Sequence, residues 1–265
     1  MITERYPADL ILNIEDFNGC GWKEALATVT ATAYHHLHDS FTNAARQAMA
    51  TGQQKHGKAL FLLAEACSMM LQPESPNEPF KPLMVLNGVR SPIPEDFSDA
   101  DLDFFAEVIP EIDDSWLKAR LADLIWLLQR RRGVNFALIA IDSYMEIPIT
   151  AETWHSDVKR GWTRAVSLAR QIRAGAGDRL QKIGSTIFQT YEAAIQSDSF
   201  WALNLAIFLL ESQLISSTGQ AAAIAGQLKS MAASYKNTEI HKAVHFYQTS
   251  AELFKIAGDT EQWAD

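Results

Sequence analysis

Apolar and polar residues follow one another along most of the chain with the spacing of helices rather than strands. Sustained period-two alternation is almost missing, and no Asn-Gly or Asp-Gly turn joins two β-branched runs. In residues 113–133 apolar side chains stand at positions 117, 121, 124, 125 and 128, which form one stripe of an α-helix. The pattern therefore predicts an all-α protein.

Helix boundaries are marked by residues that stop or start helices. Ser98 with Asp101 is a weak capping box, Gly133 follows one helix, and Thr150 precedes another. We expect about 9–11 helices, within residues 22–53 (as one helix or two), 56–71, 99–108, 113–133, 135–147, 151–174, 177–196, 199–216, 219–235 and 239–259.

The helices from residue 113 onward pair into units of similar length. The units are 113–148, 150–197, 198–237 and 238 onward, and lengths of about 36 to 48 residues are typical of helix-hairpin arrays. The segment AELFKIAGDTEQWAD at the end resembles the first helix and turn of a TPR-type repeat. The predicted fold is therefore a stack of antiparallel helix hairpins, a TPR-like α-α superhelical array.

Residues 72–97 interrupt the helical pattern and hold six of the nine prolines. A loop of this length is uncommon inside a compact domain. Its apolar side chains, such as Phe80 and Ile93, favour a connection packed on the surface, with a binding strap as the alternative. We divide the chain into N-terminal helices with this loop, 1–97, and a hairpin-repeat region, 98–265, within one continuous helical domain.

Composition and net charge limit the kinds of protein to which the chain can belong. The 265 residues are 48% hydrophobic with a net charge of −9, which indicates a globular chain that does not coat nucleic acid or anionic membrane. Two scattered cysteines, Cys20 and Cys67, do not make a disulfide framework or a Cys-rich metal site. No signal peptide is visible, and the most apolar run, 200–210, is too short to span a bilayer. We expect a cytoplasmic protein with no membrane partner.

The helix predicted for residues 151–174 has an apolar half and a mostly basic half. Residues 118–182 carry twelve Lys and Arg against six Asp and Glu, so the rest of the chain is strongly acidic. Such segregation favours a partner surface for a protein, a peptide or RNA, although a solvated helix face also accounts for it. The candidate partner-binding residues on the basic half are Lys159, Arg160, Arg164, Arg170 and Arg173.

Arg120 and Asp123 form a candidate structural pair. Arg120 falls one turn after Trp116 at the edge of the apolar stripe, and Asp123 lies three residues further on. We expect the arginine to lie half-buried along the tryptophan while its guanidinium meets the carboxylate.

Motifs that carry chemistry are missing. The chain has no G-x-x-x-x-G-K-[ST], G-x-G-x-x-G or H-E-x-x-H, and no paired acid and base or activated nucleophile. His35, His38 and Asp39 share a helix face at metal-binding spacing, but no second segment offers the remaining ligands. We therefore expect no enzyme activity, no cofactor and no metal.

The segment from Asp99 to Ile147, with ARLADLIW and AIDSYMEI, resembles the N-terminal helical region of an uncharacterised bacterial family. The resemblance implies that longer members continue into a C-terminal domain of the HEPN type, a class that includes ribonucleases. The HEPN signature, an Arg four to six residues before a His, matches none of the seven histidines. The chain resembles the helical module alone.

Two functions remain open from the sequence. The first is a non-catalytic helical-repeat scaffold that binds a protein or peptide. The alternative is a module of a HEPN-linked protein that contacts RNA through the basic face of 151–174. An array that ends on an unfinished repeat also favours a homodimer.

Overall fold

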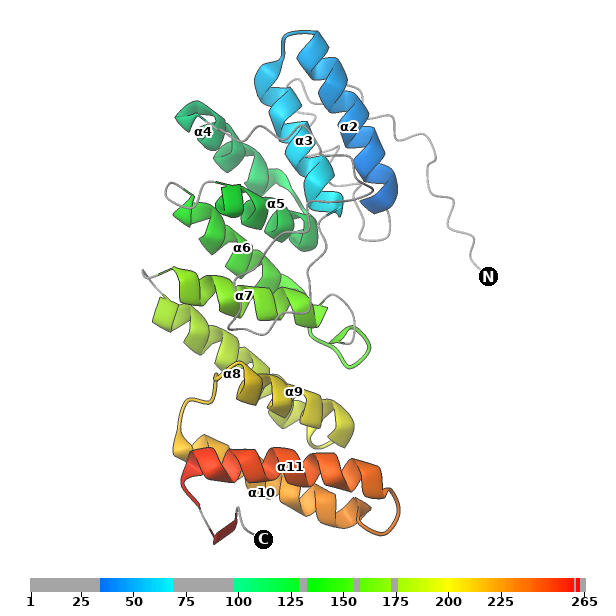
Figure 1. Cartoon of the computed structure of the whole chain (residues 1–265), viewed down its shortest axis with the longest axis vertical. Coiled ribbons are helices and arrows are strands. Elements are labelled where there is room, and N and C mark those ends of the chain that lie inside the picture. Colours follow the sequence, from blue (N-terminus) through cyan, green and yellow to red (C-terminus); the bar gives the residue numbers. More distant parts are fainter. Residues whose placement is uncertain are drawn as a thin grey trace, which may run out of the picture. The chain divides into compact units, whose positions relative to one another are not determined.

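The computed structural model describes residues 34–68, 98–128, 133–154, 158–172, 176–259 and 261–262 of the chain. Across these residues it has ten α-helices, one three-residue 3-10 helix and no strand (Figure 1). The predicted all-α array of packed helices, with about 9–11 helices, is confirmed. The Pro-rich loop 72–97 and the predicted division at residue 97 lie outside the described residues.

The chain divides into two compact units. Unit 1 comprises Met1–Pro148 and Ser156–Leu168, and unit 2 comprises Ile149–His155 and Ala169–Asp265. The division falls inside one continuous helix, α7.

Unit 1 begins, within the described residues, with an antiparallel hairpin (Figure 1). Gly52 adopts a left-handed conformation (φ 80°) at its turn, which a glycine accepts without strain. Phe41 and Leu60 from the two helices are fully buried. The elements of unit 1 are α2 (Tyr34–Ala50), α3 (Gln54–Ser68), α4 (Asp99–Val108), η3 (Ile109–Glu111), α5 (Ser115–Leu128), α6 (Val134–Glu146) and most of α7 (Lys159–Gln171).

The α5–α6 hairpin carries the first part of α7. A carboxylate oxygen of Asp114 caps α5 by accepting a hydrogen bond from the Leu117 N–H at 2.7 Å. The Trp162 indole N–H of α7 donates to the Ile147 carbonyl at the end of α6. Gly161 lies against the aromatic pair Trp116–Tyr144, whose rings meet edge to face at 5.6 Å. Glycine allows α7 to approach these rings closely.

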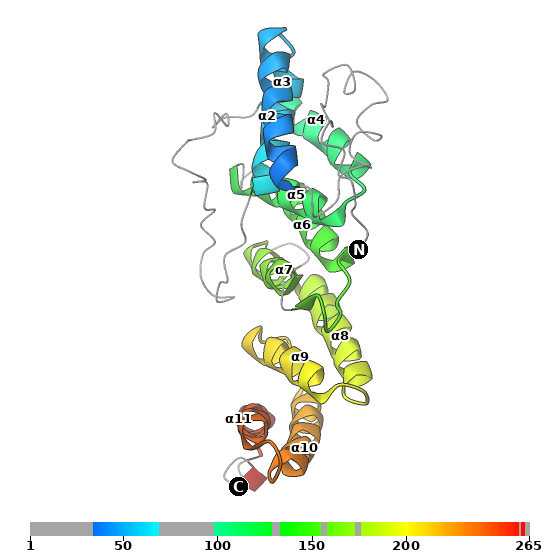
Figure 2. The same cartoon turned by 90° about the vertical axis from the view of Figure 1, so that its right-hand side faces the viewer.

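Unit 2 consists mainly of two helix hairpins, which the orthogonal view in Figure 2 also shows. Asp198 caps α9 and Ser217 caps α10 through side-chain oxygens that accept backbone N–H bonds. α11 ends at Ala257, and the following Gly258 caps it in a left-handed conformation (φ 78°). The helices are α8 (Ala176–Ala194), α9 (Ser199–Glu211), α10 (Thr218–Tyr235) and α11 (Ile240–Ala257).

The pairing of these helices differs from the predicted units. α8 packs on α9 and α10 packs on α11, whereas α9 and α10 touch only slightly. The predicted unit 198–237 joined α9 to α10 and is wrong in this respect. Four residues join each packed pair, and six separate α9 from α10.

The helix predicted for 151–174 begins with a capped turn ahead of α7. Thr150 and Thr153 bond each other reciprocally: each hydroxyl accepts a hydrogen bond from the backbone N–H of the other at 3.2 Å. These reciprocal bonds form a capping box, and the Trp154 N–H donates to the Thr150 carbonyl at 3.0 Å, so Thr150 starts a helical turn as predicted, while the helix α7 itself is described from Lys159. Trp154 follows this turn and is buried against Trp201 and Phe208 of α9.

Replacement of Gly161 by alanine tests the close approach of α7. A methyl group there would lie 2.6 Å from Cζ3 of Trp116, so we expect Gly161→Ala to lower the free energy of unfolding by about 1–3 kcal/mol. Gly226→Ala is the matched control, because Gly226 also lies in a helix but faces open space, and it should stabilise by up to about 1 kcal/mol. Urea unfolding monitored by circular dichroism measures both. Equal effects of the two substitutions would contradict the close approach.

Candidate functional site

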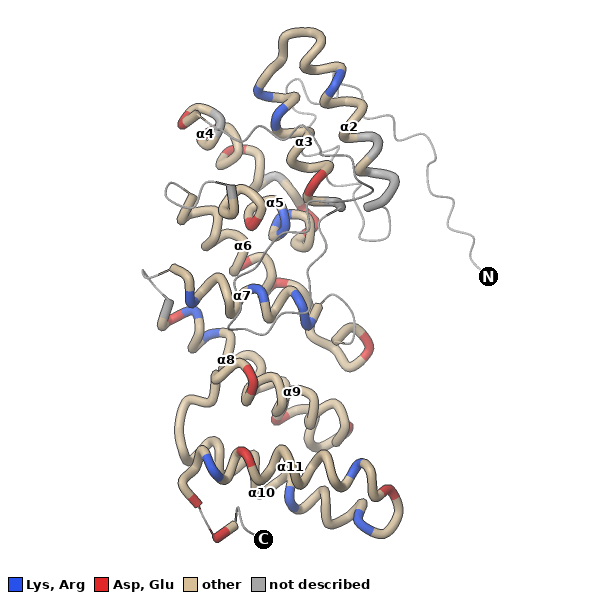
Figure 3. Tube along the Cα trace, viewed as in Figure 1, with Lys and Arg blue, Asp and Glu red and all other residues tan. Residues whose placement is uncertain are grey.

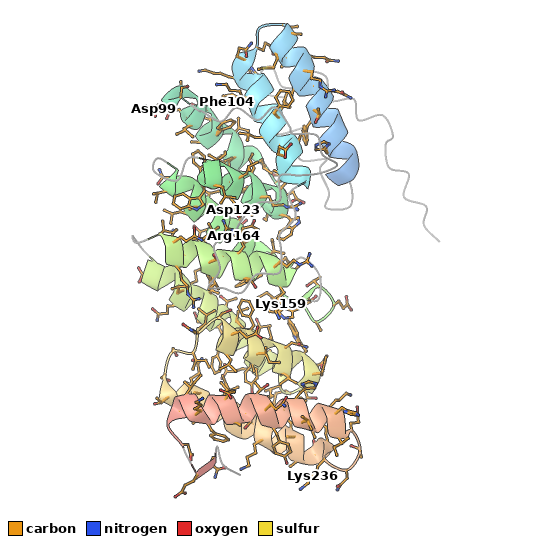
Figure 4. All side chains as sticks on the ribbon, viewed as in Figure 1. Asp99, Phe104, Asp123, Lys159, Arg164 and Lys236 are labelled. Carbon is orange, nitrogen blue, oxygen red and sulfur yellow. The ribbon has the colours of Figure 1, made fainter. Side chains whose placement is uncertain are left out.

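A buried ion pair joins α5 to α7 in unit 1. The Arg164 guanidinium donates from Nε to Oδ2 of Asp123 and from Nη2 to Oδ1, both at 2.7 Å. Asp123 is fully buried and Arg164 is 3% exposed. Figure 4 shows the two side chains directed toward each other. A bidentate pair satisfies both carboxylate oxygens in a place that water does not reach.

Two more groups complete this cluster. The Tyr144 hydroxyl of α6 donates to Oδ2 of Asp123 at 3.4 Å. Burial raises the pKa of Tyr144 well above its usual value, and the negative charge of Asp123 raises it further, so the phenol remains a neutral donor. The Arg120 guanidinium lies 5.5 Å from the centre of the Trp116 ring, a cation-π distance. The cluster ties three helices together and presents no group to a ligand from solvent.

The structure shows where Arg120 and Arg164, two of the residues predicted from the sequence, lie. Arg120 lies along Trp116 as expected, but it is buried rather than half-buried. The strong partner of Asp123 is Arg164, 41 residues further along the chain. The expectation that Arg164 lies on an exposed basic face is wrong, because pairing with the buried carboxylate turns its side chain inward. The Arg120–Asp123 contact stays a prediction.

The other basic residues of α7 fall into two groups. Lys159 and Arg160 are partly exposed at the start of the helix. Arg170 donates from Nη2 to the carbonyl of Ser212, the residue that ends α9, at 2.5 Å. A cation is favourable at this end of a helix, where unpaired carbonyls gather. Arg173 lies outside the described residues. The five predicted binding residues therefore do not form one exposed face.

Large hydrophobic side chains are exposed to solvent on α9 and α11 of unit 2. Within the described residues, the large hydrophobic side chains most exposed to solvent are Phe200 (46%) on α9 and Ile240 (64%), Val244 (46%) and Ile256 (47%) on α11. We call Phe200, Ile240 and Val244 the apolar patch.

The members of the apolar patch lie at one end of unit 2. Ser199 at the start of α9 hydrogen-bonds Tyr235 at the end of α10 at 2.7 Å. Lys242 at the start of α11 lies 5.7 Å from the centre of the same Tyr235 ring. The beginnings of α9 and α11 therefore meet around the end of α10, and α9 packs on α11. Charged residues lie at the α10–α11 turn beside the patch (Figure 3), and among them Glu239 and Lys242 form an ion pair.

The sequence of α9 does not reveal the patch, because this helix is apolar on nearly every side. A signal existed in α11, where Ile240, Val244, Tyr247 and Ala251 recur at spacings of four, three and four. The four residues form a stripe beside the buried face of Ala243 and Phe246. An apolar stripe in addition to the buried one indicates a helix with more apolar surface than its own unit covers.

Across the described residues, no group of three or more His, Cys, Asp or Glu side chains is placed to hold a metal ion. His38 lies partly exposed on α2, while the side chains of His35 and Asp39 are outside the described set. In the same part of the chain, none of the helices has the length and apolar character needed to cross a membrane.

Replacement of Arg164 measures how much the buried ion pair contributes to the free energy of unfolding. Arg164→Met leaves the Asp123 carboxylate buried without its cation, so we expect a loss of about 3–5 kcal/mol in the free energy of unfolding. Arg160→Met, on the same helix but partly exposed, should change it by less than about 1 kcal/mol. Denaturant unfolding of both variants and of Arg164→Met/Asp123→Leu measures the difference. The double variant should recover most of the loss, and no recovery would contradict the pairing.

Comparison with known proteins gives one match. Residues 7–181 match the family described as "Domain of unknown function (DUF7380)". A search of curated proteins and a search of solved structures each gave no match. The family match spans α2 to α7 and ends within α8. It covers more than half of the chain, which therefore belongs to this family of unknown function.

Proposed function

We propose that the chain is a non-catalytic, TPR-like helical-hairpin module of the cytoplasm that binds a protein partner on α9 and α11. The observation that carries the proposal is the apolar patch, in which Phe200, Ile240 and Val244 are each about half exposed or more. The partner would present apolar side chains, such as one face of an amphipathic helix, to this patch.

Energetics support this choice of surface. Burial of apolar area is the main favourable term in protein association, and a few large side chains carry most of it. α9 supplies Phe200 from a helix whose only charged residue is Glu211, at its far end. Asp198, Glu239 and Lys242 lie beside the patch, and the last two form an exposed ion pair that can stay hydrated at the rim of an interface. Isolated exposed apolar residues are common on proteins, but here they are gathered on two helices that touch.

The RNA alternative has less support. It depends on basic residues of α7 and on the resemblance to a HEPN-linked family, and the observed family match says nothing of RNA. Arg164 is held by Asp123 and Arg170 by Ser212, so binding to phosphates would fall to Lys159 and Arg160 among the described residues. Two partly exposed cations make a weak electrostatic site.

Photo-crosslinking tests the protein-binding surface. A photoreactive amino acid at Val244 should form a specific adduct in cells that make the protein, whereas one at Ser234, exposed on α10, should form none. The adduct should disappear with Phe200→Ser and Ile240→Ser, because both remove apolar contact area. The captured protein is then purified and its affinity for wild type and variants is compared, with a loss of at least about tenfold expected. Equal labelling at positions 244 and 234 would contradict the proposal.

Charge reversal tests the RNA alternative without disturbing the buried pair. We expect Lys159→Glu/Arg160→Glu to leave the protein folded, since both side chains are partly exposed. If the chain is a protein-binding module, wild type and variant should bind labelled single-stranded RNA equally weakly at all salt concentrations. A steep salt dependence in wild type, lost in the variant, would instead support the alternative.

A further inference from the structure

Two histidines stand on the exposed side of α11. His241 and His245 are four residues apart and both are exposed, so they lie one above the other on the same face of the helix. Residues with this spacing have Cβ atoms about 5–6 Å apart, close enough for both imidazoles to reach one ion. Neither the candidate site in unit 1 nor the apolar patch includes this pair.

Two imidazoles give half of a coordination shell. Zn²⁺ is almost always four-coordinate and accepts imidazole nitrogen readily, and a His pair at this spacing is a recurrent part of zinc sites. The described residues contain no group of three or more metal-binding side chains. An ion bound to His241 and His245 therefore retains two positions that these residues do not fill.

The surroundings of the pair indicate what fills them. Ile240 and Val244 each precede one of the histidines, and they are exposed by 64% and 46%. A second copy related by a twofold axis brings the same two histidines and the same two apolar side chains. Four imidazoles then complete a tetrahedral shell while the apolar residues of both copies lose contact with water.

We propose that His241 and His245 bind Zn²⁺ together with the same pair of a second copy, so that the metal joins two chains through α11. The inference rests on the proposed function in one respect, because it names a second copy as a partner of α11.

Nearby charges are compatible with a bound cation. Lys242 pairs with Glu239 and lies over the Tyr235 ring, which directs its ammonium group toward α10 and away from the histidine face. Glu252 is exposed on the same face as the pair, two turns beyond His245. Its carboxylate partly offsets the charge of a Zn²⁺ ion held by four neutral imidazoles.

Light scattering coupled to size exclusion tests the inference on the full chain with any purification tag removed. ZnCl₂ should convert monomer to dimer with one zinc per two chains, and EDTA should reverse the change. Co²⁺ in place of zinc should give the strong visible absorption of a tetrahedral ion. His241→Ala/His245→Ala should abolish both effects and leave the circular dichroism spectrum unchanged, because both side chains are exposed.

A matched control variant keeps the amino-acid composition of the chain and changes only the spacing between the two histidines of α11. His245→Gln/Gln248→His retains two histidines on α11 but separates them by seven residues, about 10 Å along the axis. This variant should stay monomeric with zinc. A wild-type chain that stays monomeric with zinc, one zinc bound per monomer, or equal dimerisation of the respaced variant would overturn the inference. If the zinc-bound dimer is disproved but Val244 crosslinks to a different protein, the proposed protein-binding function still holds. If Val244 forms no specific adduct at all, both the proposed function and the zinc-bound dimer are wrong.

Discussion

The buried pair of Asp123 and Arg164 determines much of how unit 1 is built. A charge inside a protein is tolerated only when an opposite charge with suitable hydrogen bonds lies beside it. Asp123 on α5 therefore fixes where α7 lies and which of its faces turns inward. Tyr144 from α6 joins the same carboxylate, and Gly161 supplies the space that α7 needs to come so close. The cluster fixes the positions of three consecutive helices, α5, α6 and α7, relative to one another.

Unit 2 is held together by different means. Its contacts are mainly apolar and aromatic, as in the edge-to-face contacts of Trp154 with Trp201 and Phe208. Single neutral hydrogen bonds also join its helices, such as Tyr191 with Gln227 and the buried Ser250 hydroxyl with the Ala225 carbonyl at 2.8 Å. Apolar packing sets no strict orientation for a side chain at the margin, so large residues such as Phe200 can remain in water without loss of the fold. The same tolerance gives α9 and α11 a surface for association.

Helical periodicity was sufficient to predict the fold class and the position of most helices. α4, for example, begins and ends where Ser98 and the apolar pattern indicated. Partners across the fold were harder to predict. A helical wheel treated Arg164 as exposed because it knows only the residues of its own helix, whereas Asp123 lies on another. Thr150 was correctly predicted to start a helical turn, because it forms a capping box with Thr153. The apolar patch was missed because apolar sequence alone does not say which residues a neighbour covers.

The division of the chain inside α7 has a consequence for how the protein could be taken apart. The chain leaves unit 1 for unit 2 after Pro148, returns to unit 1 at Ser156, and enters unit 2 again after Leu168. No single cut releases either unit whole, and a gene fragment that encodes one of them without gaps does not exist. The family match, which runs to residue 181, likewise includes part of both. Because each unit includes part of α7, any uninterrupted segment that contains the whole of one unit also contains residues of the other.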